Sequence, residues 1–389
     1  MSEAYMSRGV SASKTEVHKA VANLDKGLFS GAFCQLIADP CGDPAYCAAM
    51  HADGAGTKSS LAYIKFKETG AYSAFSDIAQ DSMVMNLDDL LCVGATEGFV
   101  MSNTIGRNAH RVDGNAIKSV IEGYMTFVSK MRDYGVDITM SGGETADVGD
   151  LVSTLIVDST FFVRMKRAHV IDCNNIRPGD VIVGFASFGK ADYEDRYNAG
   201  MGSNGLTAAR HLLLCHEYYT KYPETFSDTI DESKVYCGKY RFHDILPGTD
   251  VSVGDAILSP TRTYAPVVKS ILDGGRERIH GMVHCTGGGQ AKCKNFGRGL
   301  HYIKDNLFDT PPLFKLIGEN SDIGDKEMYA VFNMGHRLEM YCEEKEAADL
   351  IKRAERFGVE ARIIGRIEEN AGNGNKVTIR TDRGQYVFD

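Results

Sequence analysis

The chain has 389 residues, of which 43% are hydrophobic and 24% charged, an ordinary composition for a folded protein. Its 43 lysine and arginine residues against 52 acidic ones give a net charge of −9, which argues against nucleic acid as the main partner. No apolar run reaches the roughly 18 residues of a membrane span, and the N-terminus carries no apolar signal segment. The ten cysteines include no C-x-x-C pair. We therefore expect reduced thiols, a cytoplasmic location and no membrane partner.

The first informative stretch is 51–58, His-Ala-Asp-Gly-Ala-Gly-Thr-Lys, between a short apolar strand and an amphipathic helix. Gly54 and Gly56 can adopt positive φ and point their N–H groups at phosphate oxygens. Lys58 adds a compact positive charge, and Asp53 offers the hard oxygen ligand that Mg²⁺ prefers. The spacing matches neither a Walker A loop nor a dinucleotide fingerprint. A plain glycine turn with a surface lysine is the alternative.

A second feature is the segment 74–94, whose apolar residues predict a largely buried helix. Several of its acidic residues fall at spacings that place them on one helix face. Like charges on one face of an apolar helix are unfavourable unless a cation lies there, so the pattern favours a Mg²⁺ site over solvated surface acids. The acidic residues are Asp77, Asp81, Asp88 and Asp89.

Three later transitions repeat the pattern of apolar residues followed by glycine and polar residues. A strand at 137–140 opens into Ser-Gly-Gly-Glu at 141–144, Ser-Asn-Gly at 203–205 begins a helix, and a strand at 279–284 runs into Cys-Thr-Gly-Gly-Gly at 285–289. The start of a helix attracts phosphate, although a simple N-cap is the commoner explanation of a single Ser-Asn-Gly.

The basic, turn-rich stretch 164–178 suggests a boundary between two domains. Strands and helices alternate, but the helices are few, which favours an α+β fold over a doubly wound sheet. We place the N-terminal domain at 1–168 and the C-terminal domain at 169–389.

The motifs and their order resemble the phosphoribosylformylglycinamidine cyclo-ligase (AIR synthetase) family of purine biosynthesis. That family belongs to a wider ATP-binding superfamily that includes thiamin-phosphate kinase and selenophosphate synthetase. The resemblance runs from about Tyr5 to Arg366. It rests on DGAGTK at 53–58, MNLDDLLCVGA at 85–95, SGGETADV at 141–148, SNGL at 203–206, SPTRTY at 259–264, HCTGGG at 284–289 and MYAVFNMG at 328–335.

The resemblance implies an N-terminal α+β domain that binds ATP and Mg²⁺ and whose sheet pairs with that of a second copy, forming a barrel across a homodimer. A C-terminal α+β domain would bind the ribonucleotide substrate. The implied reaction is an ATP-dependent ring closure. The formyl amide oxygen is phosphorylated, the amidine nitrogen attacks the same carbon, and phosphate leaves.

The resemblance also assigns residues to roles. Lys58, Asp53 and His284 would be catalytic, although a buried structural histidine is an equal alternative for His284. The expected metal ligands are Asp53, Asp81, Asp89 and Glu144, of which Asp89 and Glu144 also bind the nucleotide. Gly54, Gly56, Thr57 and Lys58 would hold its phosphates. The ribose phosphate end of the substrate would face Ser203, Asn204, Gly205, Thr286, Gly287, Gly288 and Gly289.

The chain departs from the family at two places. The family has Pro-His before Ser-Asn-Gly, where this chain has Met201 and Gly202. The segments 190–202 and 216–255 also differ, and we predict that at least one of them closes over the site as a lid. A small-molecule kinase of the same superfamily and a non-catalytic nucleotide-binding relative are the alternative functions.

Overall fold

The structure is a computed structural model that describes residues 8, 20, 25 and 27–389. The sequence also predicts a helix near Lys14–Leu24, and that stretch, apart from Ala20, lies outside the described residues. Within the described residues, no helix combines the length and apolar character that crossing a membrane requires.

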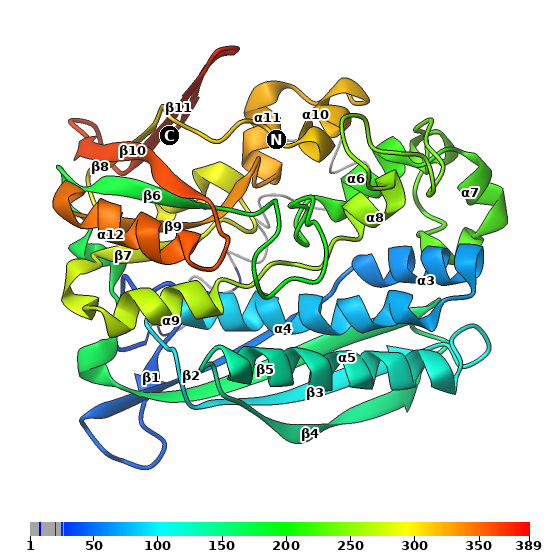
Figure 1. Ribbon diagram of the computed structural model, residues 1–389, viewed down its shortest axis with the longest axis horizontal. Helices are drawn as coiled ribbons and strands as arrows, with labels where there is room; N and C mark the ends of the chain where they lie inside the picture. The colour runs from blue at the N-terminus through cyan, green and yellow to red at the C-terminus, as the bar shows by residue number, and fades with distance from the viewer. Residues whose placement is uncertain (1–7, 9–19, 21–24, 26) are drawn as a thin grey trace.

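In the described residues, the N-terminal half is a five-stranded sheet with helices α3, α4 and α5 (Figure 1). The strand order is β1-β2-β5-β3-β4, with β3 parallel to β4 and the other pairs antiparallel. Its elements are β1 (Ile37–Ala38), β2 (Tyr46–Gly54), α3 (Lys58–Thr69), α4 (Ser76–Leu91), β3 (Phe99–Arg107), α5 (Gly114–Asp133), β4 (Ile138–Asp147) and β5 (Leu155–Lys166).

The C-terminal half has a seven-stranded sheet in the order β12-β11-β8-β10-β6-β9-β7. Its strands are β6 (Val181–Ala186), β7 (Gly281–His284), β8 (Leu300–Lys304), β9 (His336–Cys342), β10 (Ala361–Glu369), β11 (Lys376–Thr381) and β12 (Gly384–Phe388). Its helices are α6 (Leu206–Leu213), α7 (Glu217–Lys221), α8 (Val253–Ile257), α9 (Ala265–Asp273), α10 (Pro312–Glu319), α11 (Asp325–Val331) and α12 (Glu344–Glu355). The two mixed sheets agree with the predicted α+β class.

Helix α4 is the central element of the molecule. It packs against β2 and β5 on one side and against α9 of the C-terminal half on another, and Figure 1 shows it between the two halves. Nearly every residue from Ile78 to Leu91 is buried, as expected of a helix that is covered all round. The predicted buried helix at 74–94 is therefore confirmed, and its aspartates lie at the junction of the halves.

The expected glycine loops after two strands hold only in part: Gly56 lies in a turn with a positive φ of 56°, as predicted, whereas Gly54, Gly142 and Gly143 lie within strands. Strand β2 continues through Asp53 and Gly54, paired with β5 to the end. Strand β4 continues through the Ser-Gly-Gly-Glu motif beside β3, with a register shift at Ser141 and Gly142. Strand pairing satisfies the backbone groups of Asp53 and Gly54. At Gly54 the reason for glycine is steric, because an added β-carbon would lie 1.7 Å from Oδ1 of Asp158.

The sheet of the N-terminal half has one open face. In β5 the residues alternate between buried and more exposed positions along the strand, as they do when helices cover one face of a sheet. On the open face, register places Met50 opposite Phe162 and Phe162 opposite Val100. Met50 is 69% exposed and Val100 is 36% exposed, so an apolar row crosses three strands in contact with solvent.

Candidate active site

Four of the sequence motifs meet where α4 contacts the C-terminal half. Lys58, the first residue of α3, donates to Oδ1 of Asp81 over 2.6 Å and to the carbonyl of Ser259 over 2.5 Å. The same Asp81 oxygen accepts from the backbone and hydroxyl of Thr261. The DGAGTK segment and helix α4 are thereby joined to the SPTR segment. Lys58 and Asp81 are completely buried.

The position of Lys58 corrects one expectation. It does not project from an open glycine loop, because it begins a helix and lies inside the domain junction. Neither Lys58 nor Asp81 presents surface to a nucleotide in this conformation. A contact between Lys58 and phosphate stays a prediction.

The two motifs assigned to substrate lie together. A β-carbon on Gly287 would lie 3.7 Å from Nδ2 of Asn204, so the Ser-Asn-Gly turn faces the Thr-Gly-Gly-Gly loop. Ser203 is 3.4 Å from the hydroxyl of Thr261. The DGAGTK segment reaches α6, the helix that follows the Ser-Asn-Gly turn, because the hydroxyls of Thr57 and Thr207 are 2.9 Å apart.

The Thr-Gly-Gly-Gly loop is fixed by a hydrogen bond at Thr286 and by close packing at Gly289. Lys292 donates to the Thr286 hydroxyl over 2.6 Å. Gly288 and Gly289 both have positive φ, and a β-carbon on Gly289 would lie 2.5 Å from a backbone carbonyl oxygen. Glycine is therefore required at that position. A short 3₁₀ segment, η7 (Gly289–Asn295), follows where a helix was expected.

Asp89 lies between two histidines. Its Oδ1 is 2.6 Å from Nδ1 of His284, and its Oδ2 is 3.3 Å from Nε2 of His51. Burial opposes the charged carboxylate, but the hydrogen bonds from His284 and His51 outweigh it and hold the pKa of Asp89 well below its usual range. Burial lowers the pKa of His284 to about 4, so this imidazole is neutral near pH 7. His284 is fully buried, in accord with the structural alternative named for it.

Arg337 stands beside the position of the missing family histidine. A β-carbon on Gly202 would lie 3.2 Å from its guanidinium. Arg337 donates to Nε2 of His284 over 2.9 Å and pairs with Asp88 at 3.5 Å. Burial raises the pKa of Asp88 to about 7 despite that arginine. The guanidinium therefore links the His284 side of the site to α4.

The structure does not gather the four predicted metal ligands at one point within a chain. Asp81 is paired with Lys58 and Asp89 with histidines, whereas Asp53 and Glu144 are exposed. Strands β5 and β3 separate β2 from β4, so Asp53 and Glu144 lie roughly 14 Å apart at the usual strand spacing. The four predicted ligands therefore lie in separate groups within one chain, and their binding of a metal ion stays a prediction.

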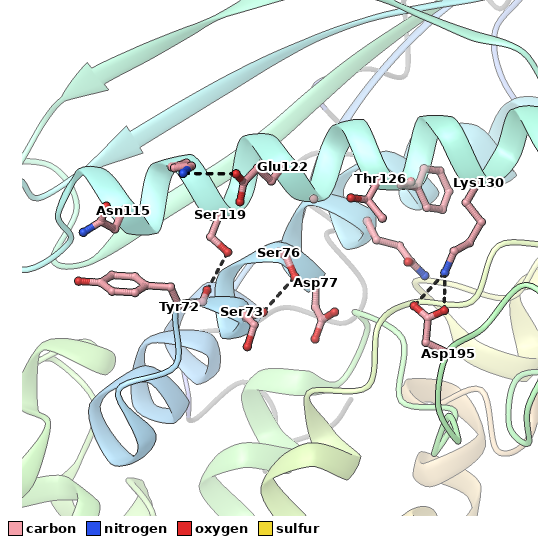
Figure 2. Close-up of a pocket in the computed structure, with 14 residues that line it drawn as sticks. Tyr72, Ser73, Ser76, Asp77, Asn115, Ser119, Glu122, Thr126, Lys130 and Asp195 are labelled. Carbon is pink, nitrogen blue, oxygen red and sulfur yellow. Dashed lines mark hydrogen bonds and ion pairs between the residues drawn. The ribbon is translucent and has the colours of Figure 1, made fainter.

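Two cavities of several hundred Å³ lie near α3, α4 and α5. One, of about 750 Å³, is lined by Gly56 and Thr57 of the DGAGTK motif and by Arg111 and Arg210. The other, of about 650 Å³, lies between α5, the start of α4 and the 190–198 region (Figure 2). Of the predicted acidic residues, only Asp77 is among the described residues that line this second cavity, whereas the first is bordered by the DGAGTK motif and fits the sequence predictions better.

The segments predicted as lids are packed in place. Segment 216–255 lies on α3, where Tyr222 and Lys221 both donate to Glu68 and Glu224 accepts from Tyr63. Segment 190–202 bridges to the N-terminal half. Its Asp195 accepts two hydrogen bonds from Lys130 in Figure 2. Both segments therefore act as braces in this conformation.

Sequence reasoning missed several residues of this region. Cys34 and Asp158 lie in stretches with no recognisable motif, His51 begins the informative stretch 51–58 without being given a role, and Arg337 lies on a strand just after FNMG. Asp158 on β5 lies in register with Gly54. Burial, and then the nearby negative charge of Asp53, raises the pKa of Asp158. The signal for His51 was its place two residues before Asp53, which puts both on one face of β2.

Comparison with known proteins gives two matching family models. The N-terminal domain of AIR synthase related protein matches residues 35–162, and the C-terminal domain of the same family matches residues 177–377. The phosphoribosylformylglycinamidine cyclo-ligase of Methanococcus vannielii is 28% identical over 322 residues, which are 82% of this chain and 77% of that protein. The enzyme of that name from Methanocaldococcus jannaschii is 28% identical over 337 residues, 85% and 81% of the two chains.

Solved structures share the fold at low identity. Thermotoga maritima PurL complexed with ADP has a TM-score of 0.54 at 13% identity and covers 98% of this chain, which spans about half, 49%, of the PurL chain. A HypE–HypF complex gives a TM-score of 0.54 at 12% identity, with 96% and 98% of the two chains covered.

Proposed function

This chain belongs to the AIR synthase related family, and we propose that it catalyses the ATP-dependent ring closure of formylglycinamidine ribonucleotide to aminoimidazole ribonucleotide in purine biosynthesis. The observation that carries the proposal is the meeting of the DGAGTK, SPTR, SNGL and TGGG segments at one junction. In a reaction between ATP and a phosphorylated substrate, the glycine-rich segments that would bind each of the two molecules must lie at one place.

The proposed chemistry has two steps. The formyl amide oxygen attacks the γ-phosphorus of ATP, releasing ADP and making that oxygen a good leaving group. The amidine nitrogen then attacks the activated carbon, the C–O bond breaks, and inorganic phosphate departs as the imidazole closes. Phosphoryl transfer needs positioning and charge stabilisation more than covalent help from the protein.

We place the nucleotide phosphates in the cavity of about 750 Å³ beside the start of α3. Gly56 and Thr57 line that cavity, Gly54 precedes them at the end of β2, and a helix N-terminus favours anions. Cavities of roughly 300–1,000 Å³ are typical of ligand sites. The substrate would then lie toward Ser203, Asn204, Gly205 and the loop formed by Thr286, Gly287, Gly288 and Gly289.

The donor groups fit Mg²⁺ in part. Asp53 and Glu144 offer exposed carboxylates, and Oδ2 of Asp81 is a buried oxygen that finds no hydrogen-bond partner among the described residues. Such hard oxygens suit Mg²⁺, which when bound would neutralise phosphate charge. Lys58 would act by fixing Asp81 and the start of α3.

We further propose that two copies associate through the open face of the N-terminal sheet, as the family resemblance implies. The exposed apolar row of Met50, Phe162 and Val100 supports this assembly. The division into a nucleotide-binding domain at 1–168 and a substrate-binding domain at 169–389 belongs to the same proposal.

Incubation of the purified chain with formylglycinamidine ribonucleotide, ATP and Mg²⁺ tests the reaction. We expect aminoimidazole ribonucleotide and ADP in equal amounts, with neither formed when the ribonucleotide is omitted. Formation of ADP together with a phosphorylated, unclosed product would instead indicate a kinase. Absence of both products would contradict the proposal.

A further inference from the structure

Three side chains of metal-binding type meet beside α4. Cys34 precedes β1, His51 lies on β2, and Asp89 lies on α4. One ligand atom of each lies within 4.8 Å of the others. The thiol of Cys34 is 3.2 Å from the backbone carbonyl of Asp89. The side chain of His51 is 24% exposed, so an ion can reach the group from solvent beside this imidazole.

The orientation of the His51 ring is fixed by a hydrogen bond at its Nδ1. Its Nδ1 is 2.9 Å from Oδ1 of Asn86. The amide of Asn86 cannot be turned over, because its Nδ2 donates to the carbonyls of Asp53, Ser82 and Ser159. Nδ1 of His51 therefore carries the proton that it donates to Asn86. Its Nε2 faces Oδ2 of Asp89 over 3.3 Å, and a metal ion bound here would replace the proton that Nε2 shares with that carboxylate.

The orientation of Asp89 is fixed in the same way. Arg337 donates to Nε2 of His284, and a guanidinium cannot accept, so His284 carries its proton on Nδ1. That proton is donated to Oδ1 of Asp89. The second oxygen, Oδ2, is left facing Nε2 of His51. Outer hydrogen bonds of this kind orient the ligands of metal sites.

We propose that Cys34, His51 and Asp89 form a binding site for Zn²⁺ or a divalent ion of similar ligand preference, with a fourth position open to water. A thiolate and an imidazole select zinc over Mg²⁺, which prefers oxygen ligands. Zinc bond lengths place tetrahedral ligand atoms roughly 3.3–3.8 Å apart. The His51–Asp89 separation of 3.3 Å already meets this distance. Cys34 lies outside helix and strand, so a small backbone shift brings its sulfur in.

A second group of similar composition provides a contrast. Cys285, His336 and Glu339 also lie within 4.8 Å of one another, but all three are buried. The ammonium of Lys304 already pairs with Glu339, whose other oxygen accepts from Tyr341 over 2.5 Å. An ion would have to displace the buried ammonium of Lys304 and has no route from solvent through the described residues, so the Cys34 group is the better candidate.

The inference stands apart from the proposed reaction and revises one sequence prediction. Asp89 is assigned to a zinc-type ion, whereas Asp53, Asp81 and Glu144 remain predicted for Mg²⁺. Because the readout is metal binding alone, failure of the zinc site leaves the ring-closure proposal untouched, and the reverse also holds.

Cobalt supplies a spectroscopic test on the full chain. After treatment with a chelator, titration with Co²⁺ should give a thiolate-to-cobalt charge-transfer band that saturates at one ion per chain. Zn²⁺ should displace the Co²⁺, and millimolar Mg²⁺ should leave the band unchanged. Cys34→Ser should abolish the band, and His51→Gln should weaken Co²⁺ binding at least tenfold.

Cys41→Ser is the matched control, because Cys41 is an exposed cysteine in the same region of the chain and should leave the band intact. Circular dichroism checks that each variant folds, and His51→Gln keeps the test decisive if Cys34→Ser does not. The proposal is overturned if the wild-type chain shows no band, if Cys34→Ser retains it, or if Mg²⁺ displaces the Co²⁺.

Discussion

Lys58 and Asp81 form a buried ion pair that joins the two halves of the molecule, because Lys58 also donates to Ser259. Lys58→Ala would leave the carboxylate of Asp81 buried without its cation. Breaking a buried pair from one side costs about 3–5 kcal/mol, so this variant should lose that much free energy of unfolding. Chemical denaturation measures the loss.

Two variants make the Lys58 result specific. The double change Lys58→Met with Asp81→Leu should recover much of the stability, since it removes both charges together. Lys118→Ala should have little effect, because Lys118 lies on the surface with its side chain 71% exposed. Equal stability of Lys58→Ala and the wild type would contradict the structural role.

His211 should make stability depend on pH. Burial, then the nearby charge of Arg210, lowers the pKa of this imidazole to about 2, against about 6.5 in the unfolded chain. Below pH 6.5 the unfolded chain takes up a proton that the folded chain does not. The stability present above pH 6.5 is therefore lost progressively as the pH falls, by about 3 kcal/mol at pH 4.

Denaturation at a series of pH values checks this contribution. His211→Phe should flatten the dependence of stability on pH between pH 6.5 and 4, because it removes the titrating imidazole. Tyr236 can still pack against the new ring, so the fold should be kept. His216→Phe is the control, since its imidazole is half exposed and should leave the slope unchanged. Identical slopes for the wild type and His211→Phe would show that the buried imidazole is not responsible.

At the scale of elements, segment 216–255 should resist proteolysis whether or not ligands are bound. Its buried aromatic side chains and its contacts with Glu68 on α3 hold it against the N-terminal half. This expectation opposes the lid predicted from the sequence. Limited proteolysis with and without ATP analogue and substrate distinguishes a brace from a lid.

Glu68→Ala tests the brace directly. The carboxylate accepts from Lys221 and Tyr222, so the variant should lose about 2–3 kcal/mol of stability and be cleaved faster within 216–255. Glu217→Ala is the comparison, because Glu217 makes an exposed ion pair with Arg241 and should leave cleavage unchanged. Ligand-dependent protection in the wild type would restore the lid.

The sequence predicted what local chemistry determines and missed what depends on long-range contacts. The apolar content of 74–94 was enough to predict a buried helix, and the glycine motifs identified the segments that meet at the junction. Spacing along the chain could not show that Lys58 would donate to the carbonyl of Ser259, 201 residues away. Nor could it show that Gly54 is required by Asp158, because that contact depends on the pairing of β2 with β5.

At the scale of the whole molecule, the central position of α4 ties the two halves into one unit. Its aspartates take partners from both: Asp81 from α3 and the SPTR segment, and Asp89 from β2 and β7. A change in this helix should therefore affect both halves together. The helix-covered side of the N-terminal sheet is used in this contact, which leaves the other face for a partner.

The exposed row on that face predicts a homodimer. Met50, Phe162 and Val100 lie side by side across β2, β5 and β3, and three neighbouring apolar side chains in water favour association. We expect light scattering at micromolar concentration to give twice the mass of the chain. Met50→Glu and Val100→Glu should each yield a folded monomer, because a buried unpaired carboxylate is costly at an interface. Met125→Glu, on the exposed side of α5, should remain dimeric; a shift to monomer in that variant alone would move the interface to the helices.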